Sequence, residues 1–193
     1  MRARLSVLYR TDTHPRTGIV SLLLQSTVEP DWSRLPVGYL LETEGGPANS
    51  HTKPIDSAFG SLRPGMELRF RLHANPTKKI DTKSGPDGRR RNGKRADLRD
   101  EGSQLGWLSR RAELGGFELL TVQARPDVPN VRIEPGDQVV GSRVAARLTF
   151  GSVLFEGMLR ITDAETFRQT LVSGLGPGKA YGFGLLSVAR PPG

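Results

Sequence analysis

The residues best suited to chemistry by type and spacing are the glycines and the lysine of a short segment near the C-terminus. Residues 174–184 read GLGPGKAYGFG, with Gly174, Gly176 and Gly178 at alternate positions and Lys179 directly after them. Glycine carries no side chain to hold a ligand away from the backbone, so backbone amides in such a loop can approach an anion. The segment indicates either an anion-contacting loop or a flexible connector.

Two nucleotide-binding templates do not fit this segment. A Walker A loop ending at Gly178 and Lys179 requires glycine at 173 and serine or threonine at 180, where the chain has Ser173 and Ala180. The dinucleotide-binding pattern beginning at Gly174 requires glycine where Lys179 stands. Both templates also need a strand before the loop and a helix after it, the reverse of the predicted order. Nucleotide binding is therefore disfavoured, and contact with a nucleic-acid backbone stays open.

Three histidines are the candidates for acid–base chemistry. His14 lies in a Pro- and Gly-containing turn and His51 in a long loop, so both are predicted to be solvated. His73 shares one face of a predicted strand with Arg69 and Arg71, which makes it the best placed of the three, although an ordinary outward polar position is the simpler interpretation. With no cysteine and three widely separated histidines, neither a metal nor another cofactor is expected.

The aromatic candidates are weaker. Tyr9 and Tyr39 are predicted to pack or to lie in loops. Tyr181 stands beside the glycines, where stacking on a base is conceivable.

The positive charge is concentrated in one stretch. The 193 residues contain 28 Lys and Arg against 20 Asp and Glu, a formal net charge of +8. Residues 69–111 contain 13 Lys and Arg against 5 Asp and Glu, so this stretch holds the whole excess. A local excess of this kind is typical of a surface that binds a polyanion, because phosphates attract Lys and Arg and release counterions. The alternative is a solubilising loop.

The same composition excludes several classes of protein. No window of eighteen apolar residues exists, and the N-terminus meets charged and turn residues before a signal-peptide core could form. The expected location is the cytoplasm. With 36% hydrophobic residues the chain can build a core, so a globular protein is predicted.

Hydrophobic patterning predicts a mixed chain. In the first half it predicts strands over 4–9 and 19–25, a helical turn near 31–35, and a strand over 66–73. In the second half it predicts a brief strand at 94–98, a helix ending at 114, strands over 117–123, 143–150, 153–161 and 185–189, and a helix that Asp163 caps. Strand, helix, strand, strand, helix, strand is the ferredoxin-like order.

The expected fold class is therefore α+β, with two tandem ferredoxin-like (βαββαβ) domains, the first lacking its opening strand and helix. The predicted ranges are 1–80 for this incomplete N-terminal domain, 81–93 for a basic linker, and 94–193 for the C-terminal domain that carries the glycine-rich loop.

Several segments together resemble the CasE family, the CRISPR repeat-processing endoribonucleases of the type I-E Cascade complex. The matching segments are GLGPGKAYGFGLLSVA at 174–189, TVEPDW at 27–32, LRFRLHANPTKK at 68–79, QLGWLSRR at 104–111 followed by GGFEL, and VLFEG at 153–157. They occur in the family's order across essentially the whole chain, which makes the combination more specific than any one glycine pattern.

This resemblance implies a repeat stem-loop RNA as partner, together with the other Cascade subunits. It implies that Gly174, Gly176, Gly178 and Lys179 contact the RNA backbone, and that Arg143 and Arg147 lie on or near a hairpin that contacts the stem; Lys78 and Lys79 are weaker candidates. The implied reaction is metal-independent attack of a ribose 2′-OH on the adjacent phosphate, which matures the guide RNA for antiviral defence. Basic groups on an A-form stem are expected to recognise mainly shape and phosphates.

The chain departs from the family pattern at its start. The family's catalytic His and Tyr lie on the first helix, whereas here Met1 is followed at once by what matches the second strand. No catalytic residue is assigned. A misassigned start and a fragment both stay open as explanations of the missing strand and helix. A strand-exchanged homodimer stays open as one way to complete the first domain. The alternatives to the nuclease are a non-cleaving stem-loop binder within Cascade and a ferredoxin-like RNA-binding protein of another pathway.

Overall fold

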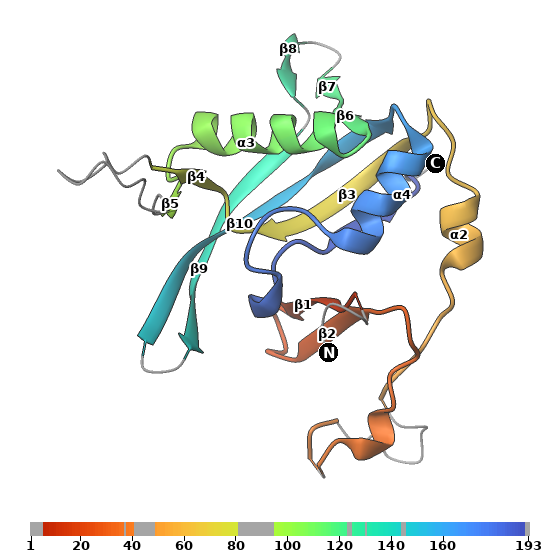
Figure 1. Ribbon diagram of the computed structural model, residues 1–193, viewed down its shortest axis with the longest axis vertical. Helices are drawn as coiled ribbons and strands as arrows, with labels where there is room; N and C mark the ends of the chain where they lie inside the picture. The colour runs from red at the N-terminus through yellow and green to blue at the C-terminus, as the bar shows by residue number, and fades with distance from the viewer. Residues whose placement is uncertain are drawn as a thin grey trace, which may run out of the picture.

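The computed structural model describes residues 6–36, 38–40, 49–80, 95–122, 125–129, 131–143 and 146–191. The chain forms a mixed structure dominated by β-sheet (Figure 1). Its elements, in order, are β1 (Leu8–Thr13), β2 (Val20–Gln25), the 3-10 helix η1 (Trp32–Arg34), α2 (Asp56–Gly60), β3 (Glu67–Ala74), β4 (Thr77–Lys79), β5 (Arg95–Asp97), α3 (Glu101–Leu114), β6 (Phe117–Leu119), β7 (Thr121–Val122), β8 (Arg125–Pro129), β9 (Val131–Arg143), β10 (Ala146–Ile161), α4 (Ala164–Ser173), the 3-10 helix η2 (Lys179–Tyr181) and β11 (Leu186–Ala189).

The main sheet has five strands and is antiparallel throughout. Its order is β11-β3-β10-β6, and β9 pairs with β10 along the part of β10 that β6 does not reach. Strand β10 is thus central, with β3 on one side and β6 and β9 on the other. The remaining pairs are the ribbons β1-β2, β4-β5 and β7-β8.

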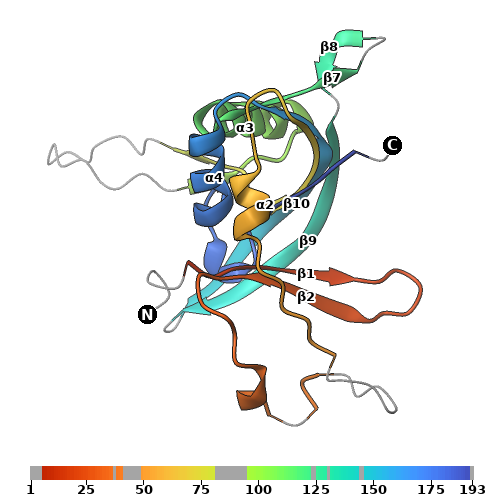
Figure 2. The ribbon, with the colours of Figure 1, turned by 90° about the vertical axis from the view of Figure 1, so that its right-hand side faces the viewer.

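Helices α3 and α4 cover one face of this sheet (Figures 1 and 2). Alternate residues of β3, namely Leu68, Phe70 and Leu72, are buried in the core beneath them, as the predicted alternation required. From α4 comes Phe167, whose ring meets Phe117 edge-on at 5.5 Å between centroids. The core therefore lies between the sheet and these two helices.

Both helices begin and end where the sequence indicates. Asp100 and Asp163 are the N-caps, and their carboxylates accept hydrogen bonds from the backbone N–H of Ser103 at 2.7 Å and of Thr166 at 2.9 Å. Helix α4 ends at Gly174, whose φ of 73° is a conformation that glycine adopts without strain. The glycine-rich segment thus starts directly at the C-terminus of α4.

The β1-β2 hairpin lies beside the main sheet, near the C-terminal end of α4 (Figure 2). Gln25 Nε2 donates a 2.8 Å hydrogen bond to the carbonyl of Leu171, and Arg10 NH1 donates one of 3.0 Å to Ser187 Oγ of β11. Leu8 is 2% exposed. These contacts fix one end of the hairpin against the sheet and α4.

The rest of the hairpin is open. The apolar side chains of Ile19, Val20, Leu22 and Leu23 are 46%, 61%, 51% and 45% exposed. Among the described residues β1 and β2 pair only with each other. These four side chains form an exposed apolar patch on the hairpin.

The sheet corrects two sequence-based strand assignments. The strand predicted over 94–98 is β5, which pairs with β4 rather than with β10. The strand between β11 and β10 is β3, which the sequence assigned to the N-terminal range 1–80. The apolar face of β3 completes the core under α3 and α4, whereas the three residues of β5 include no large apolar side chain to bury there.

A third correction concerns β10. The sequence predicted an antiparallel pair over 143–150 and 153–161, but residues 146–161 form one continuous strand, β10, which pairs with β3, β6 and β9. The register shifts between Phe150 and Ser152, and this irregularity around Gly151 breaks the alternation in a way that imitates a turn. Strand β9 and the short helix α2 were not predicted.

Two further observations bear on the sequence-based expectations. The predicted linker 81–93 lies outside the described residues. Within the part of the chain that the structure describes, no helix has the length and apolar character needed to cross a membrane.

Candidate nucleic-acid interface

The glycine-rich segment 174–184 connects α4 to β11 along a defined path. Gly174, Gly176 and Gly178 have φ values of 73°, 77° and 77°, in the left-handed region that favours glycine. The N–H of Leu175 donates to the carbonyl of Gly184 at 2.9 Å, so the two ends of the segment are joined. The segment is therefore held by backbone geometry, which disfavours the flexible connector.

Close packing gives a second reason for glycine at these positions. A Cβ added at Gly176 would lie 2.8 Å from Cζ2 of Trp107, and one at Gly178 would lie 2.7 Å from Cδ2 of Phe183. Real Cβ atoms essentially never approach other heavy atoms so closely. The two glycines thus let the loop lie directly on buried aromatic rings, independently of any ligand.

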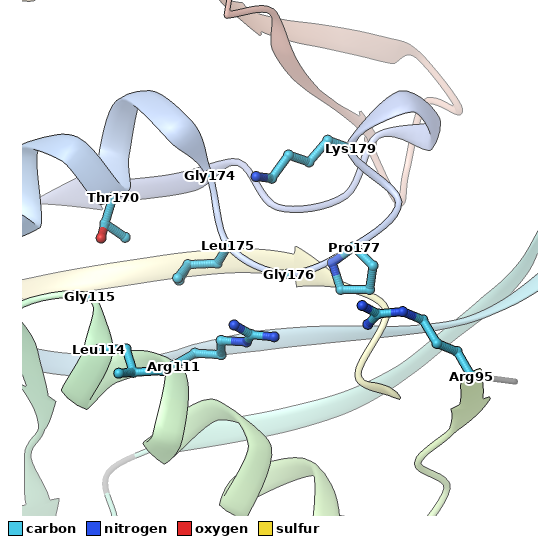
Figure 3. Close-up of a pocket in the computed structure, with 10 residues that line it drawn as sticks. All are labelled: Arg95, Arg111, Leu114, Gly115, Thr170, Gly174, Leu175, Gly176, Pro177 and Lys179. Atoms are coloured by element: carbon cyan, nitrogen blue, oxygen red, sulfur yellow. The ribbon is translucent and has the colours of Figure 1, made fainter. Parts of the chain in front are cut away.

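A pocket of about 300 Å³ opens between this loop, the C-terminal end of α3 and strand β5 (Figure 3). We call it the loop pocket. Its lining residues are Arg95, Arg111, Leu114, Gly115, Thr170, Gly174, Leu175, Gly176, Pro177 and Lys179.

The polar side chains of the loop pocket are strongly cationic. Arg111 comes from the last turn of α3, Arg95 from β5 and Lys179 from the start of η2, and Figure 3 shows Arg111 and Arg95 extending toward the loop at Pro177. The guanidinium carbon of Arg111 lies 5.7 Å from the centroid of the Trp107 ring, a cation–π distance. Burial, and then the charge of Arg111, lower the pKa of the Lys179 ammonium.

Three of the predicted RNA-contacting residues line this pocket. Lys179 lines it directly, as do Gly174 and Gly176, whereas Gly178 is not among the lining residues. Lys78 and Lys79 lie exposed on β4, and Lys79 is paired in register with Arg95 of the pocket. The β4-β5 ribbon therefore places Lys79, with Lys78 beside it, next to a residue that lines the loop pocket.

Arg143 and Arg147 lie elsewhere. Arg143 is the last residue of β9, and Arg147 pairs with Ser142 near the start of β10. Both are therefore at the tip of the long β9-β10 hairpin, which projects beyond the rest of the sheet (Figure 1). The backbone thus places both residues on a hairpin, and their contact with RNA stays a prediction.

The three histidines lie apart from the loop pocket. His73 packs edge-on against Phe183 at 5.1 Å between centroids. Burial lowers its pKa, as do the charges of Arg10 and Arg71, with Asp12 acting in the opposite direction. His14 Nδ1 accepts a hydrogen bond from the N–H of Thr17 in a turn, and His51 is exposed. The histidine side chains are thus not gathered at one place.

Tyr181 also has a partner other than a base. Its ring lies 4.6 Å from that of Phe150, centroid to centroid, so it is packed against β10. Among the residues that the structure describes, no group of three or more His, Asp or Glu is arranged to hold a metal ion.

Sequence reasoning did not single out Arg95 or Arg111. Both contribute to the local charge excess over 69–111, and Arg111 also ends the segment QLGWLSRR that carries the family resemblance. That they line the same pocket as Lys179 depends on the packing of α3 and β5 around the loop, which no sequence spacing shows.

Comparison with known proteins defines the class of molecule. A family model described as CRISPR associated protein matches residues 1–190. The chain belongs to this family. Within it, the chain is a homologue of Cse3 and CasE, and the predicted CasE resemblance is confirmed.

Two curated relatives and one solved structure give the extent of the similarity. The CRISPR-associated endoribonuclease Cse3 of Thermus thermophilus is 38% identical over 87% of this chain and 72% of its own length. The Cascade subunit CasE of Escherichia coli is 33% identical over 66% of this chain and 60% of its own length. A structure of CRISPR endoribonuclease Cse3 bound to 19 nt RNA has a TM-score of 0.77, with 35% identity, and covers 98% of this chain and 82% of its own.

Proposed function

We propose that this protein binds the repeat stem-loop of precursor CRISPR RNA and cleaves it to yield mature guide RNA. The observation that carries the proposal is the similarity, over nearly the whole chain, to an endoribonuclease solved with bound RNA. The local charge excess supports it, because duplex phosphates favour a basic surface.

The proposed RNA surface has two parts. Gly174, Gly176 and Lys179 face the backbone of the RNA from the glycine-rich loop, with Gly178 next to them. Arg143 and Arg147 contact the stem from the tip of the β9-β10 hairpin. Lys78 and Lys79 extend the basic surface along β4. Cationic groups at these places would recognise phosphates and helix shape rather than base sequence.

The proposed reaction is metal-independent transesterification. The ribose 2′-oxygen forms a bond to the adjacent phosphorus while the bond from phosphorus to the 5′-oxygen breaks. The 2′-OH proton passes to a base, and an acid gives a proton to the leaving oxygen, so the products are a 2′,3′-cyclic phosphate and a 5′-OH. Cationic groups beside the phosphate stabilise its developing charge. We assign the acid and base roles to no residue of this chain.

The proposed architecture places this surface on a ferredoxin-like unit. Strands β3, β6, β10 and β11 with helices α3 and α4 follow the order βαββαβ. On this view the unit begins at β3, earlier than the predicted boundary at residue 94. The β1-β2 hairpin would belong to a second unit.

We further propose that the protein acts as a subunit of Cascade and retains the processed RNA. The alternative function is a stem-loop binder that does not cleave. The name of the Escherichia coli relative, a Cascade subunit, supports the assembly. The unpaired edges of the β1-β2 hairpin would accept a strand from another chain, including a second copy.

A single assay separates the two functions. A repeat hairpin labelled at its 5′ end is incubated with the protein in EDTA and analysed on native and denaturing gels. Cleavage at one site, with a cyclic phosphate on the 5′ product, supports the metal-independent nuclease. A shifted but intact hairpin supports the binder. Absence of a shift at low salt would reject both.

A further inference from the structure

The loop pocket gathers three cations from three separate segments of the chain. Arg95, Arg111 and Lys179 all line a space of about 300 Å³. Within the described ranges, none of the three has a carboxylate oxygen within 4.0 Å of its side-chain nitrogens. Like charges that share a partly desolvated pocket repel one another. Their arrangement therefore favours an anion between them.

The helix ends that border the pocket offset only part of this charge. Gly115 follows the last residue of α3 and Gly174 follows that of α4, and both line the pocket. Each helix C-terminus carries about −0.5 of an elementary charge. Two ends therefore offset about one of the three positive charges and leave about two. Inorganic phosphate or a phosphate monoester carries a negative charge of about that size, and a phosphodiester of an RNA strand carries one negative charge.

The walls of the pocket suit a small tetrahedral anion. Gly174 and Gly176 present backbone without side chains, so an anion can approach the loop closely. The Arg111 guanidinium is kept in place over the ring of Trp107, which is itself 3% exposed. A guanidinium held in this way donates two parallel hydrogen bonds to phosphate at little entropic cost. Burial and the charge of Arg111 lower the pKa of the Lys179 ammonium, as expected for a cation that shares a pocket with a second cation.

We propose that the loop pocket binds one phosphate group, with Arg111 and Lys179 as its main ligands and Arg95 at its edge. The proposal adds Arg95 and Arg111 to the predicted site and shares Lys179 with it, so it rests partly on the proposed function. The phosphate belongs either to an RNA strand or to a free phosphate compound, since the same groups recognise both.

The first arm of the test uses inorganic phosphate and needs no RNA. Trp32→Phe leaves Trp107 as the only tryptophan, and its emission reports on the guanidinium above it. Phosphate is titrated against chloride at constant ionic strength. We expect a saturable change in Trp107 emission with phosphate and none with chloride. Equal responses to the two anions would overturn the proposal.

Matched variants locate the binding in this reporter background. Arg111→Gln and Arg110→Gln remove the same charge from adjacent positions of α3, and only Arg111 lines the pocket. We expect Arg111→Gln to weaken phosphate binding about tenfold and Arg110→Gln to leave it unchanged. Circular dichroism and thermal melts check that both are folded. Equal affinities in the two variants would overturn the proposal.

The second arm identifies the source of the phosphate with a labelled repeat hairpin. If RNA supplies it, Arg111→Gln lowers hairpin affinity and reduces the salt slope by about one relative to Arg110→Gln. If both variants bind the repeat hairpin RNA with equal affinity, and only Arg111→Gln loses binding of inorganic phosphate, the pocket binds a free phosphate compound. Saturable phosphate binding without any hairpin binding supports the pocket and rejects the proposed function.

Discussion

The backbone of Gly176 lies directly on the indole of Trp107, so closely that an added Cβ would stand 2.8 Å from Cζ2. This contact links the glycine-rich loop to the buried face of α3 and to the guanidinium of Arg111 above the same ring. The position of the loop, and with it that of Lys179, therefore depends on how α3 packs.

The first prediction concerns this contact. Gly176→Ala should destabilise the protein by about 2 to 5 kcal/mol, because it adds an unfavourable φ and an overlap with a buried ring. Gly65→Ala is the matched control, since Gly65 has a φ of 85° but nothing within 4 Å of an added Cβ. It should cost about 1 kcal/mol. Urea unfolding measures both, and equal losses would show that the contact with Trp107 is unimportant.

The second prediction concerns Lys179. Lys179→Ala should weaken binding of the repeat hairpin about tenfold and reduce its salt slope by about one, because one phosphate contact is lost. Lys53→Ala removes the same charge from an exposed loop and should change neither quantity. Filter binding over a range of salt concentrations measures both. A slope that stays the same in Lys179→Ala would remove this lysine from the RNA surface.

The third prediction concerns the pH dependence of stability through His73. Burial and the charges of Arg10 and Arg71 lower its pKa in the folded state below 6.5. The unfolded chain therefore takes up the proton first as the pH falls. The contribution of neutral His73 to stability is full above pH 6.5 and declines as the pH falls from 6.5 toward the folded-state pKa.

Replacing His73 tests this linkage. His73→Gln should lose less stability than the wild type between about pH 7.5 and pH 5.5, a window that follows from the lowered pKa. His51→Gln, at an exposed loop position, should behave as the wild type does. Urea unfolding at the two pH values gives the comparison. The idea fails if His73→Gln and the wild type lose the same free energy of unfolding.

The fourth prediction concerns self-association through the β1-β2 hairpin. Its exposed apolar side chains, and its edges that pair with no other described strand, should bring two copies together at micromolar concentration. Leu22→Lys with Leu23→Lys should raise the dissociation constant at least about tenfold. Tyr39→Lys adds one positive charge at another exposed hydrophobic position and should have little effect. Size-exclusion chromatography with light scattering decides, and a wild-type protein that is monomeric throughout would contradict the prediction.

Local sequence determined much of the secondary structure. The N-caps Asp100 and Asp163, the alternation along β3, and the helix-ending glycines all lie where the sequence indicates, because each depends on residues only a few positions apart. The family followed from short segments in a characteristic order. The concentration of charge between residues 69 and 111 was also visible without a structure.

The tertiary structure decided which strands share a sheet and which cations share a pocket. Strand pairing joins residues that are far apart in the chain, so no local pattern could place β3 between β10 and β11 or show that β10 is continuous through its bulge. Arg95, Arg111 and Lys179 line one pocket for the same reason, since the packing of α3 and β5 around the loop places them there. The sequence determined the chemistry of these side chains, and their convergence is a property of the fold alone.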